Sequence, residues 1–271
     1  MKNILQKLLR VDRRFLFLLL TLCIVIPIIK PLGLPNKSIS KDVKNVYDFV
    51  ENLKEGSTLF LSLDYDPSTA PELHPQAVAI VKHAFKKNVK IVVLTYIAGS
   101  TGLIDQLFEK LPKEYNKEYG KDYVILPYMA NALAVLTQMS SNIYKIYDKD
   151  RDGHDLKQMP IMKNINNYRD IAGVINITGT GILDYWVGYV GDKYNVPVMG
   201  GVTAISQVGY GPYLQKNQLK GLIGGMKGAA EYESLIKEPG KGTSGIDALN
   251  IAHLLVLVLI IFSNIALFIL K

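Results

Sequence analysis

The sequence predicts a doubly wound α/β domain with a mostly parallel, five-stranded, Rossmann-like sheet, flanked by N- and C-terminal transmembrane helices. Short apolar segments alternate with longer segments that repeat apolar residues at helical spacing. Two long apolar runs lie near the chain ends, while the composition between them is that of a globular core. Strands that alternate with helices indicate right-handed crossovers and a parallel sheet covered on both faces.

The predicted first strand lies in residues 58–67, TLFLSLDYDP, an apolar run that ends in two acidic residues, a proline and Ser68. An uninterrupted apolar run of this length is typical of a strand that is buried on both faces. Four further strands are expected at residues 89–95, 122–127, 172–178 and 196–199. Helices are expected at residues 38–53, 71–88, after 99–102, and at 131–147, 181–194 and 215–236, with a flexible linker at 239–245.

The two apolar runs divide the chain into four parts. Residues 15–29 are apolar, and the run extends to 34 if Lys30 places its charge at the membrane surface, while residues 251–270 form the second run. A membrane span needs roughly 20 apolar residues. We therefore expect a basic N-terminus at 1–14, transmembrane helices at 15–34 and 246–271, and a soluble domain at 35–245.

Positive charge predicts the orientation in the cell membrane. The isoelectric point is about 9.2, but the excess charge lies beside the first apolar run, in Lys2, Lys7, Arg10, Arg13 and Arg14. The positive-inside rule then predicts cytoplasmic termini and an extracytoplasmic domain. The domain itself is nearly neutral, which argues against nucleic acid as a partner. The single cysteine lies in the first apolar run, so the domain can form no disulfide.

Polar residues after the predicted strands point to a ligand site at the carboxyl edge of the sheet, formed by Asp64, Asp66, Ser68, Thr95, Gly179 and Gly181. The first four resemble the opening motifs of haloacid-dehalogenase-type phosphohydrolases. That resemblance implies Asp64 as nucleophile, Asp66 as acid/base and bound Mg²⁺. The later acidic pair of that family has no counterpart here. In the simpler interpretation, the two carboxylates cap the adjacent helix and accept loop amides.

Two more groups of residues are candidates for binding. Asp148, Asp150 and Asp152, followed by Gly153, match the first half of a calcium loop, although Met159 stands where a bidentate Glu belongs. A solvated acidic loop is the alternative. Gly221, Gly224, Gly225 and Gly228 fall in the expected helix at 215–236, with spacing that allows close approach of another backbone. That backbone belongs either to the same subunit or to a second copy.

The chain also resembles, from end to end, a group of prokaryotic membrane proteins of unknown function. The likeness rests on Gly33-Leu34-Pro35, Val46-Tyr47-Asp48, Asp64-Tyr65-Asp66-Pro67, Pro71-Glu72-Leu73, Met159-Pro160-Ile161-Met162 and Gly228-Ala229-Ala230-Glu231. It implies the two-helix layout and no particular activity.

The sequence completes no catalytic set, so we expect a membrane-anchored, non-enzymatic binding or assembly module. Its expected partners are the lipid bilayer and either further copies of the chain or another membrane protein, with no cofactor beyond a possible Ca²⁺ or Mg²⁺. The alternatives are an Mg²⁺-dependent phosphohydrolase that uses Asp64 and Asp66, and a sensor or transport subunit that binds a small ligand at the carboxyl edge.

Overall fold

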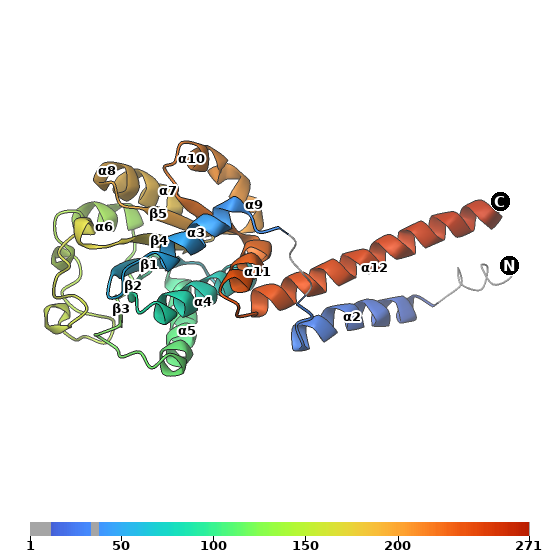
Figure 1. The fold of residues 1–271 in the computed structure, drawn as a ribbon, viewed down its shortest axis with the longest axis horizontal. Helices are drawn as coiled ribbons and strands as arrows, with labels where there is room; N and C mark the ends of the chain where they lie inside the picture. The colour runs from blue at the N-terminus through green and yellow to red at the C-terminus, as the bar shows by residue number, and fades with distance from the viewer. Residues whose placement is uncertain (1–11, 34–37, 271) are drawn as a thin grey trace.

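A six-stranded, all-parallel sheet forms the centre of the computed structural model, which describes residues 12–33 and 38–270 (Figure 1). The strand order is β3-β2-β1-β4-β5-β6. The strands are β1 (Thr58–Asp64), β2 (Lys90–Leu94), β3 (Tyr123–Ile125), β4 (Gly173–Thr178), β5 (Val198–Val202) and β6 (Gly221–Gly224). The parallel α/β prediction is confirmed, but the sheet has one strand more than the predicted five.

Strand β1 is central and completely buried, as its apolar run predicts. It pairs with β2 on one side and β4 on the other, with Ser62 opposite both Leu94 and Asn176. The order 3-2-1-4-5-6 is that of dinucleotide-binding α/β sheets, in which the strand order reverses between β1 and β4. The carboxyl end of β1, at Asp64, therefore lies at the position where such sheets place a ligand.

Helices cover both faces of the sheet, because alternate strand side chains point to opposite sides. Leu59, Leu61 and Leu63 pack in one apolar core, whereas Phe60 packs in the other. The first core is covered by α3 (Lys41–Glu51), α4 (Ala70–Lys86), α5 (Thr101–Glu114) and α11 (Gly225–Leu235). The second is covered by α6 (Ala132–Met139), α7 (Ile182–Tyr185) and the π-helical turn η5 (Trp186–Gly191).

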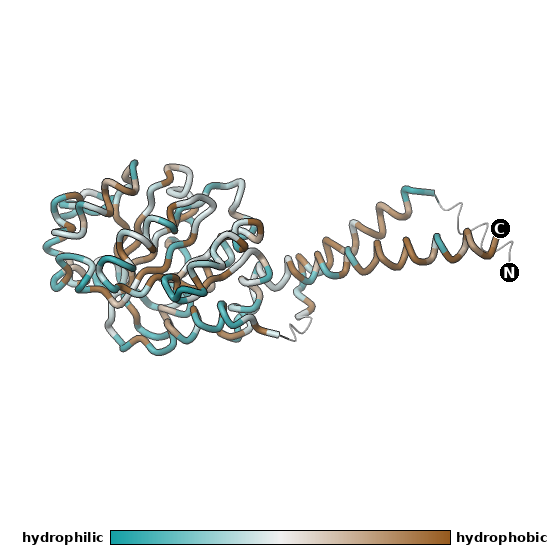
Figure 2. The backbone as a smooth tube through the Cα atoms, turned by 90° about the horizontal axis from the view of Figure 1, so that it is seen from above, coloured by the Kyte–Doolittle hydropathy of each residue, from teal (hydrophilic) through white to brown (hydrophobic). Residues whose placement is uncertain are grey.

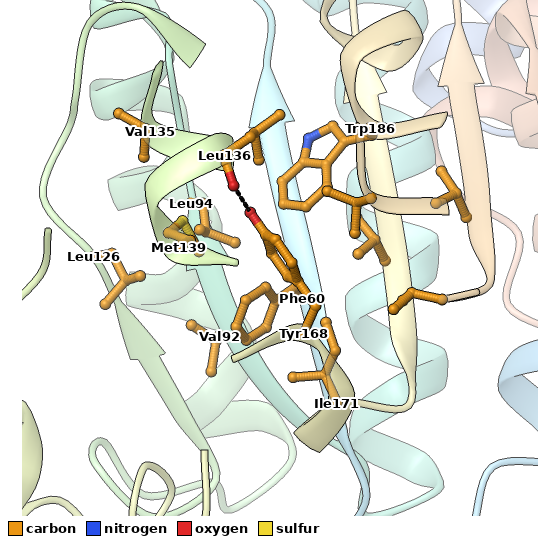
Figure 3. Close-up of a cluster of buried hydrophobic side chains, with 14 of the residues drawn as sticks. Phe60, Val92, Leu94, Leu126, Val135, Leu136, Met139, Tyr168, Ile171 and Trp186 are labelled. Atoms are coloured by element: carbon orange, nitrogen blue, oxygen red, sulfur yellow. Dashed lines mark hydrogen bonds between the residues drawn. The ribbon is translucent and has the colours of Figure 1, made fainter. Parts of the chain in front are cut away.

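Aromatic side chains fill the second core (Figure 3). Trp186 and Tyr168 meet edge to face, with ring centroids 6.1 Å apart. Buried Tyr168 donates a hydrogen bond from its hydroxyl to the carbonyl of Leu136, at 2.8 Å. This bond satisfies a polar group that would otherwise be costly to bury.

Two predicted element boundaries are wrong. The helix expected over 131–147 ends at Met139, and the chain continues through the short 3₁₀ turn η2 (Ile143–Lys145). Strand β5 extends through Gly200 and Gly201, which we expected to form a loop. A Cβ atom on Gly200 would collide with Leu183 and Leu222. Glycine is therefore needed here for close packing between the strand and its covering helix.

The prediction of one helix over 215–236 is also wrong. The segment divides into strand β6, which pairs with β5, and helix α11. Gly225 joins them with a φ of +57°, a left-handed conformation that glycine adopts readily. A Cβ on Gly221 would collide with Val46 of α3, and one on Gly228 with Ile223. These two glycines, with Gly224 and Gly225, are buried within the same subunit, and the prediction that they contact a second subunit gains no support.

One helix of the described chain, α12 (Lys241–Leu270), is long and apolar enough to cross a membrane. Helix α2 (Arg13–Ile29) is also apolar but has only 17 residues, so the described N-terminal helix is too short to qualify as the first membrane span predicted over 15–34. Figure 2 shows both as a hydrophobic extension from the domain. Residues 1–11 of the predicted basic N-terminus and residue 34 lie outside the described residues.

Helix α12 begins inside the domain, where we expected a flexible linker. It packs antiparallel to α11: Gly242 lies against Ala229, and Gly245 lies against Met226. Two glycines on one face of α12 allow this close contact. Because Met226 stands at the start of α11, directly after β6, α12 leaves the domain past the carboxyl edge of the sheet.

Two buried carboxylates fix α12 to the domain and the segment after α2 to α12. Glu233 of α11 accepts the backbone N–H groups of Gly240, Gly242 and Thr243, at 2.7–2.9 Å, and the Thr243 hydroxyl at 2.6 Å. It therefore caps the first turn of α12, whose N–H groups have no partner within the helix. Asp247 of α12 accepts the N–H groups of Leu32 and Gly33, which follow α2.

We predict that Glu233→Ala lowers the free energy of unfolding by about 2–4 kcal/mol, because it leaves several buried donors without an acceptor. Glu233→Gln keeps one oxygen and should lose less. Urea unfolding in detergent micelles measures both.

The matched control is Glu118→Ala, which removes an exposed carboxylate paired with Lys121 and should change stability by less than about 0.5 kcal/mol. Equal effects of Glu233→Ala and Glu118→Ala would contradict a capping role for Glu233.

Candidate functional site at the carboxyl edge of the sheet

Asp64 lies at the switch point of the sheet, but it is completely buried. Its Oδ2 accepts hydrogen bonds from the Ser62 hydroxyl, at 2.5 Å, and from the Asn176 amide, at 2.6 Å. Its Oδ1 accepts the N–H of Tyr96, at 2.7 Å, and a longer bond from the Thr95 hydroxyl. The carboxylate thus joins β1 to β4 and to the end of β2.

Burial raises the pKa of Asp64 to about 6, although the hydrogen bonds from Ser62, Tyr96 and Asn176 oppose this rise by stabilising the charged form. The proton therefore binds more tightly in the folded protein than in the unfolded chain. A nucleophilic carboxylate must reach its substrate, whereas Asp64 has no exposed surface. Its geometry favours a structural role.

Asp66 and Ser68 form a local turn on the surface instead of a pair with Asp64. Asp66 Oδ1 accepts the backbone N–H of Ser68, at 2.9 Å, and the Ser68 hydroxyl, at 2.6 Å. These bonds hold the pKa of Asp66 below its usual range. This is the simpler alternative, in which the acidic residue satisfies loop amides ahead of α4.

Gly179 and Gly181 follow β4 at the same edge. Gly179 packs against the loop that follows β1. A Cβ on Gly179 would lie only 2.9 Å from the Thr69 hydroxyl oxygen, and the Gly179 N–H donates to the carbonyl of Asp64. Gly181 faces the carboxylate of Asp184. The loops after β1 and β4 are therefore in contact at the switch point, and a small ligand there stays a prediction.

Sequence reasoning missed Ser62, Tyr96 and Asn176, which surround Asp64. Ser62 and Asn176 are polar residues within otherwise apolar strands, and the two-residue period of β1 places Ser62 on the same face as Asp64. That signal was present in the sequence. The strand order that brings Asn176 beside Asp64 was not. Asn176 Oδ1 is buried without a hydrogen-bond partner in the described part of the chain.

The acidic loop at 148–155 has a different arrangement from the predicted one. Asp150, Asp152 and His154 bring their ligand atoms within 4.8 Å of one another, without Asp148. Asp150 is buried and already accepts the Tyr119 hydroxyl, at 2.8 Å, and the backbone N–H groups of Asp152 and His154. Burial acts to raise its pKa, but hydrogen bonds from Tyr119 and His154 outweigh this and lower it. Asp150 is therefore not part of a solvated loop, the alternative that the sequence suggested, but holds the loop together from within, and calcium binding stays a prediction.

Comparison with known proteins gives no match: no family model, no curated protein and no solved structure is significantly similar to the chain. The predicted resemblance to a membrane-protein group and the partial resemblance to phosphohydrolases therefore stay predictions. The fold and the site define a class: a parallel α/β domain with Rossmann strand order, a sealed carboxylate at its switch point and a long apolar C-terminal helix.

We predict that Asp64 makes stability depend on pH. Because its folded pKa is raised, the stabilisation it contributes is complete below about pH 4 and is lost as pH rises through about 6. Relative to Asp64→Asn, the wild-type free energy of unfolding should fall by about 3 kcal/mol over this range, since each pKa unit corresponds to about 1.4 kcal/mol. Urea unfolding at a series of pH values measures the difference.

Asparagine at position 64 keeps the shape of the aspartate side chain. The Asn176 amide can rotate so that its oxygen, not its N–H, faces the new amide. Asp64→Leu should destabilise at every pH, because it leaves the donors from Ser62, Asn176 and Tyr96 unpaired. Asp66→Asn should keep the wild-type profile between about pH 4 and 6, because Asp66 already ionises below its usual range. Parallel profiles for wild type and Asp64→Asn would contradict titration of Asp64 in this range.

Proposed function

We propose that this chain is a membrane-anchored, non-enzymatic binding module, which holds the carboxyl edge of its α/β domain at the bilayer surface and assembles there with further copies or another membrane protein. One observation carries the proposal: α12 packs along α11 and leaves the domain past that edge.

The length and composition of α12 support anchoring. Its last twenty residues are apolar apart from His253, Ser263 and Asn264, and at about 1.5 Å per residue they extend about 30 Å, the thickness of the hydrocarbon layer. Large side chains such as Leu257 and Ile261 are exposed along it. Helix α2 lies beside α12 (Figure 1) and exposes apolar side chains to the same surroundings.

The connection between anchor and domain supports a platform with a fixed orientation. Glu233 caps α12, and Asp247 holds the segment after α2, so both apolar helices are bonded to the domain or to each other near the edge. A domain held in this way presents one edge to the membrane. Such a fixed orientation suits a module that meets its partners in or on the bilayer.

Charge supports the orientation across the membrane. Arg13 and Arg14 begin α2, at the end of the helix pair that is far from the domain (Figure 1). By the positive-inside rule this end is cytoplasmic and the domain extracytoplasmic.

The geometry argues against the phosphohydrolase alternative. Asp64 is buried and committed to hydrogen bonds, and Asp66 binds its own loop. The grouped metal-ligating side chains found in the described residues lie at Asp150, Asp152 and His154, not at Asp64. A sensor or transport subunit with a ligand at the carboxyl edge is compatible with this orientation and remains a variant of the same proposal.

We predict that the double variant Leu257→Arg, Ile261→Arg abolishes stable membrane insertion, because each charge at a helix centre costs about 2.5–3.5 kcal/mol. Resistance of the full chain to extraction by alkaline carbonate is the measurement. The matched control, Leu257→Ala with Ile261→Ala, should remain in the membrane. Release of the wild-type chain by carbonate would contradict anchoring.

We also predict that the full chain, extracted into lipid nanodiscs, has a mass that is a multiple of one chain by light scattering corrected for lipid. The exposed apolar surface of α2 and α12 gives such copies a shared contact inside the bilayer. A mass of one chain would contradict self-assembly and leave a different membrane protein as the partner.

A further inference from the structure

Two aliphatic side chains project from the carboxyl edge without covering neighbours. Ile205 is 90% exposed and Val208 is 83% exposed. Ile205 lies on the short helix α9 (Ala204–Gln207), and Val208 begins the 3₁₀ turn η6 (Val208–Tyr210) that follows it. The other large apolar side chains exposed in the described part of the domain are mostly tyrosines, with less than half of their surface accessible. Exposed apolar surface that is contiguous, unlike apolar residues scattered singly, is where contact surfaces are sought.

The protein holds this pair in a fixed position. The Thr203 hydroxyl caps α9 by accepting the N–H of Ser206. The N–H of Ala204 donates to Glu72 at the start of α4, at 2.9 Å. Gln207, three residues after Ala204, packs against Gly224 of β6. These contacts fix α9 against Gly224 and the start of α4, while the side chains of Ile205 and Val208 stay exposed.

The position of α9 relative to α12 determines what lies near this pair. Helix α9 packs beside β6 and α11, and α11 packs beside α12. Figure 1 shows α9 on the side of the domain from which α2 and α12 extend. Gly245 of α12 is level with the start of α11. The apolar run begins six residues later, at about 9 Å for a rise of about 1.5 Å per residue. The headgroup layer on each side of a bilayer is about 5–8 Å thick. With α12 upright, the level of Gly245 therefore lies next to the outer face of this layer.

We propose that Ile205 and Val208 form a second membrane contact, which inserts into the headgroup region of the same leaflet that α12 enters. The inference rests on the proposed anchoring by α12, and it assigns a lipid surface to α9 and η6. A bilayer accommodates a pair of aliphatic side chains, whereas a stable protein interface needs about 800 Å² from each partner. Attachment at both α12 and α9 would fix the tilt of the domain on the membrane.

Fluorescence quenching in vesicles tests this contact on the full chain. In a Cys23→Ser background, single cysteines replace Ile205, Val208, Leu257 or Glu55, and each carries an environment-sensitive fluorophore. Glu55 is exposed just before β1, at the amino edge, and provides the control far from the membrane. The vesicles contain phosphatidylcholine and phosphatidylglycerol, with nitroxide-labelled lipid whose spin label is either shallow or deep in the acyl chains.

The proposal expects shallow nitroxides to quench the fluorophores at 205 and 208 strongly, with blue-shifted emission, while Glu55→Cys stays unquenched. Leu257→Cys reports the anchor separately, because it should respond to the deep nitroxide. Quenching at 257 without quenching at 205 and 208 overturns the second contact and leaves the anchor intact. No quenching at 257 overturns the anchor itself. A blue shift at 205 and 208 without quenching means that protein covers the pair, which also overturns the lipid contact.

Discussion

The antiparallel packing of α12 against α11 determines how the molecule is oriented. Gly242 and Gly245 let the two helices approach closely, and Glu233 satisfies the first N–H groups of α12 at the point where the chain turns. Helix α11 begins at the carboxyl edge because it follows a parallel strand. A helix that runs back along it must therefore leave past that edge. The edge that faces the bilayer in our proposal, and with it the placement of Ile205 and Val208 relative to the bilayer, depends on this contact.

The centre of the sheet contains a carboxylate where comparable folds bind a ligand. Asp64 binds Ser62 on its own strand, Asn176 on β4 and the Tyr96 N–H after β2, so it joins three segments at the point where strand order reverses. Its burial costs solvation energy, which appears as the raised pKa. The hydrogen bonds offset part of this cost. The contact between Gly179 and Thr69 closes the same region. The polar groups at this edge therefore bond to one another and hold the loops together.

Local periodicity was sufficient to predict most of the fold. The uninterrupted apolar run of β1 and the 3.6-residue period of α3 and α4 gave correct elements, because each pattern matches the burial of its own element. The segment 215–236 failed because its glycines belong to a strand that forms only by pairing with β5. For the site, the sequence correctly placed Asp64 at the end of a strand. It could not show that Asn176, more than a hundred residues away, would donate a hydrogen bond to the Asp64 carboxylate.

The sequence by itself determined the alternation of strands and helices and the apolar helix at the C-terminus, because these depend on residues close together in the chain. Tertiary structure decided the sixth strand, the burial of Asp64, the packing of the glycines within one subunit and the edge past which α12 leaves. Each of these depends on contacts between distant segments, whose free energy exists only once the sheet has formed. Side-chain type alone therefore could not distinguish a buried structural carboxylate from an exposed reactive one.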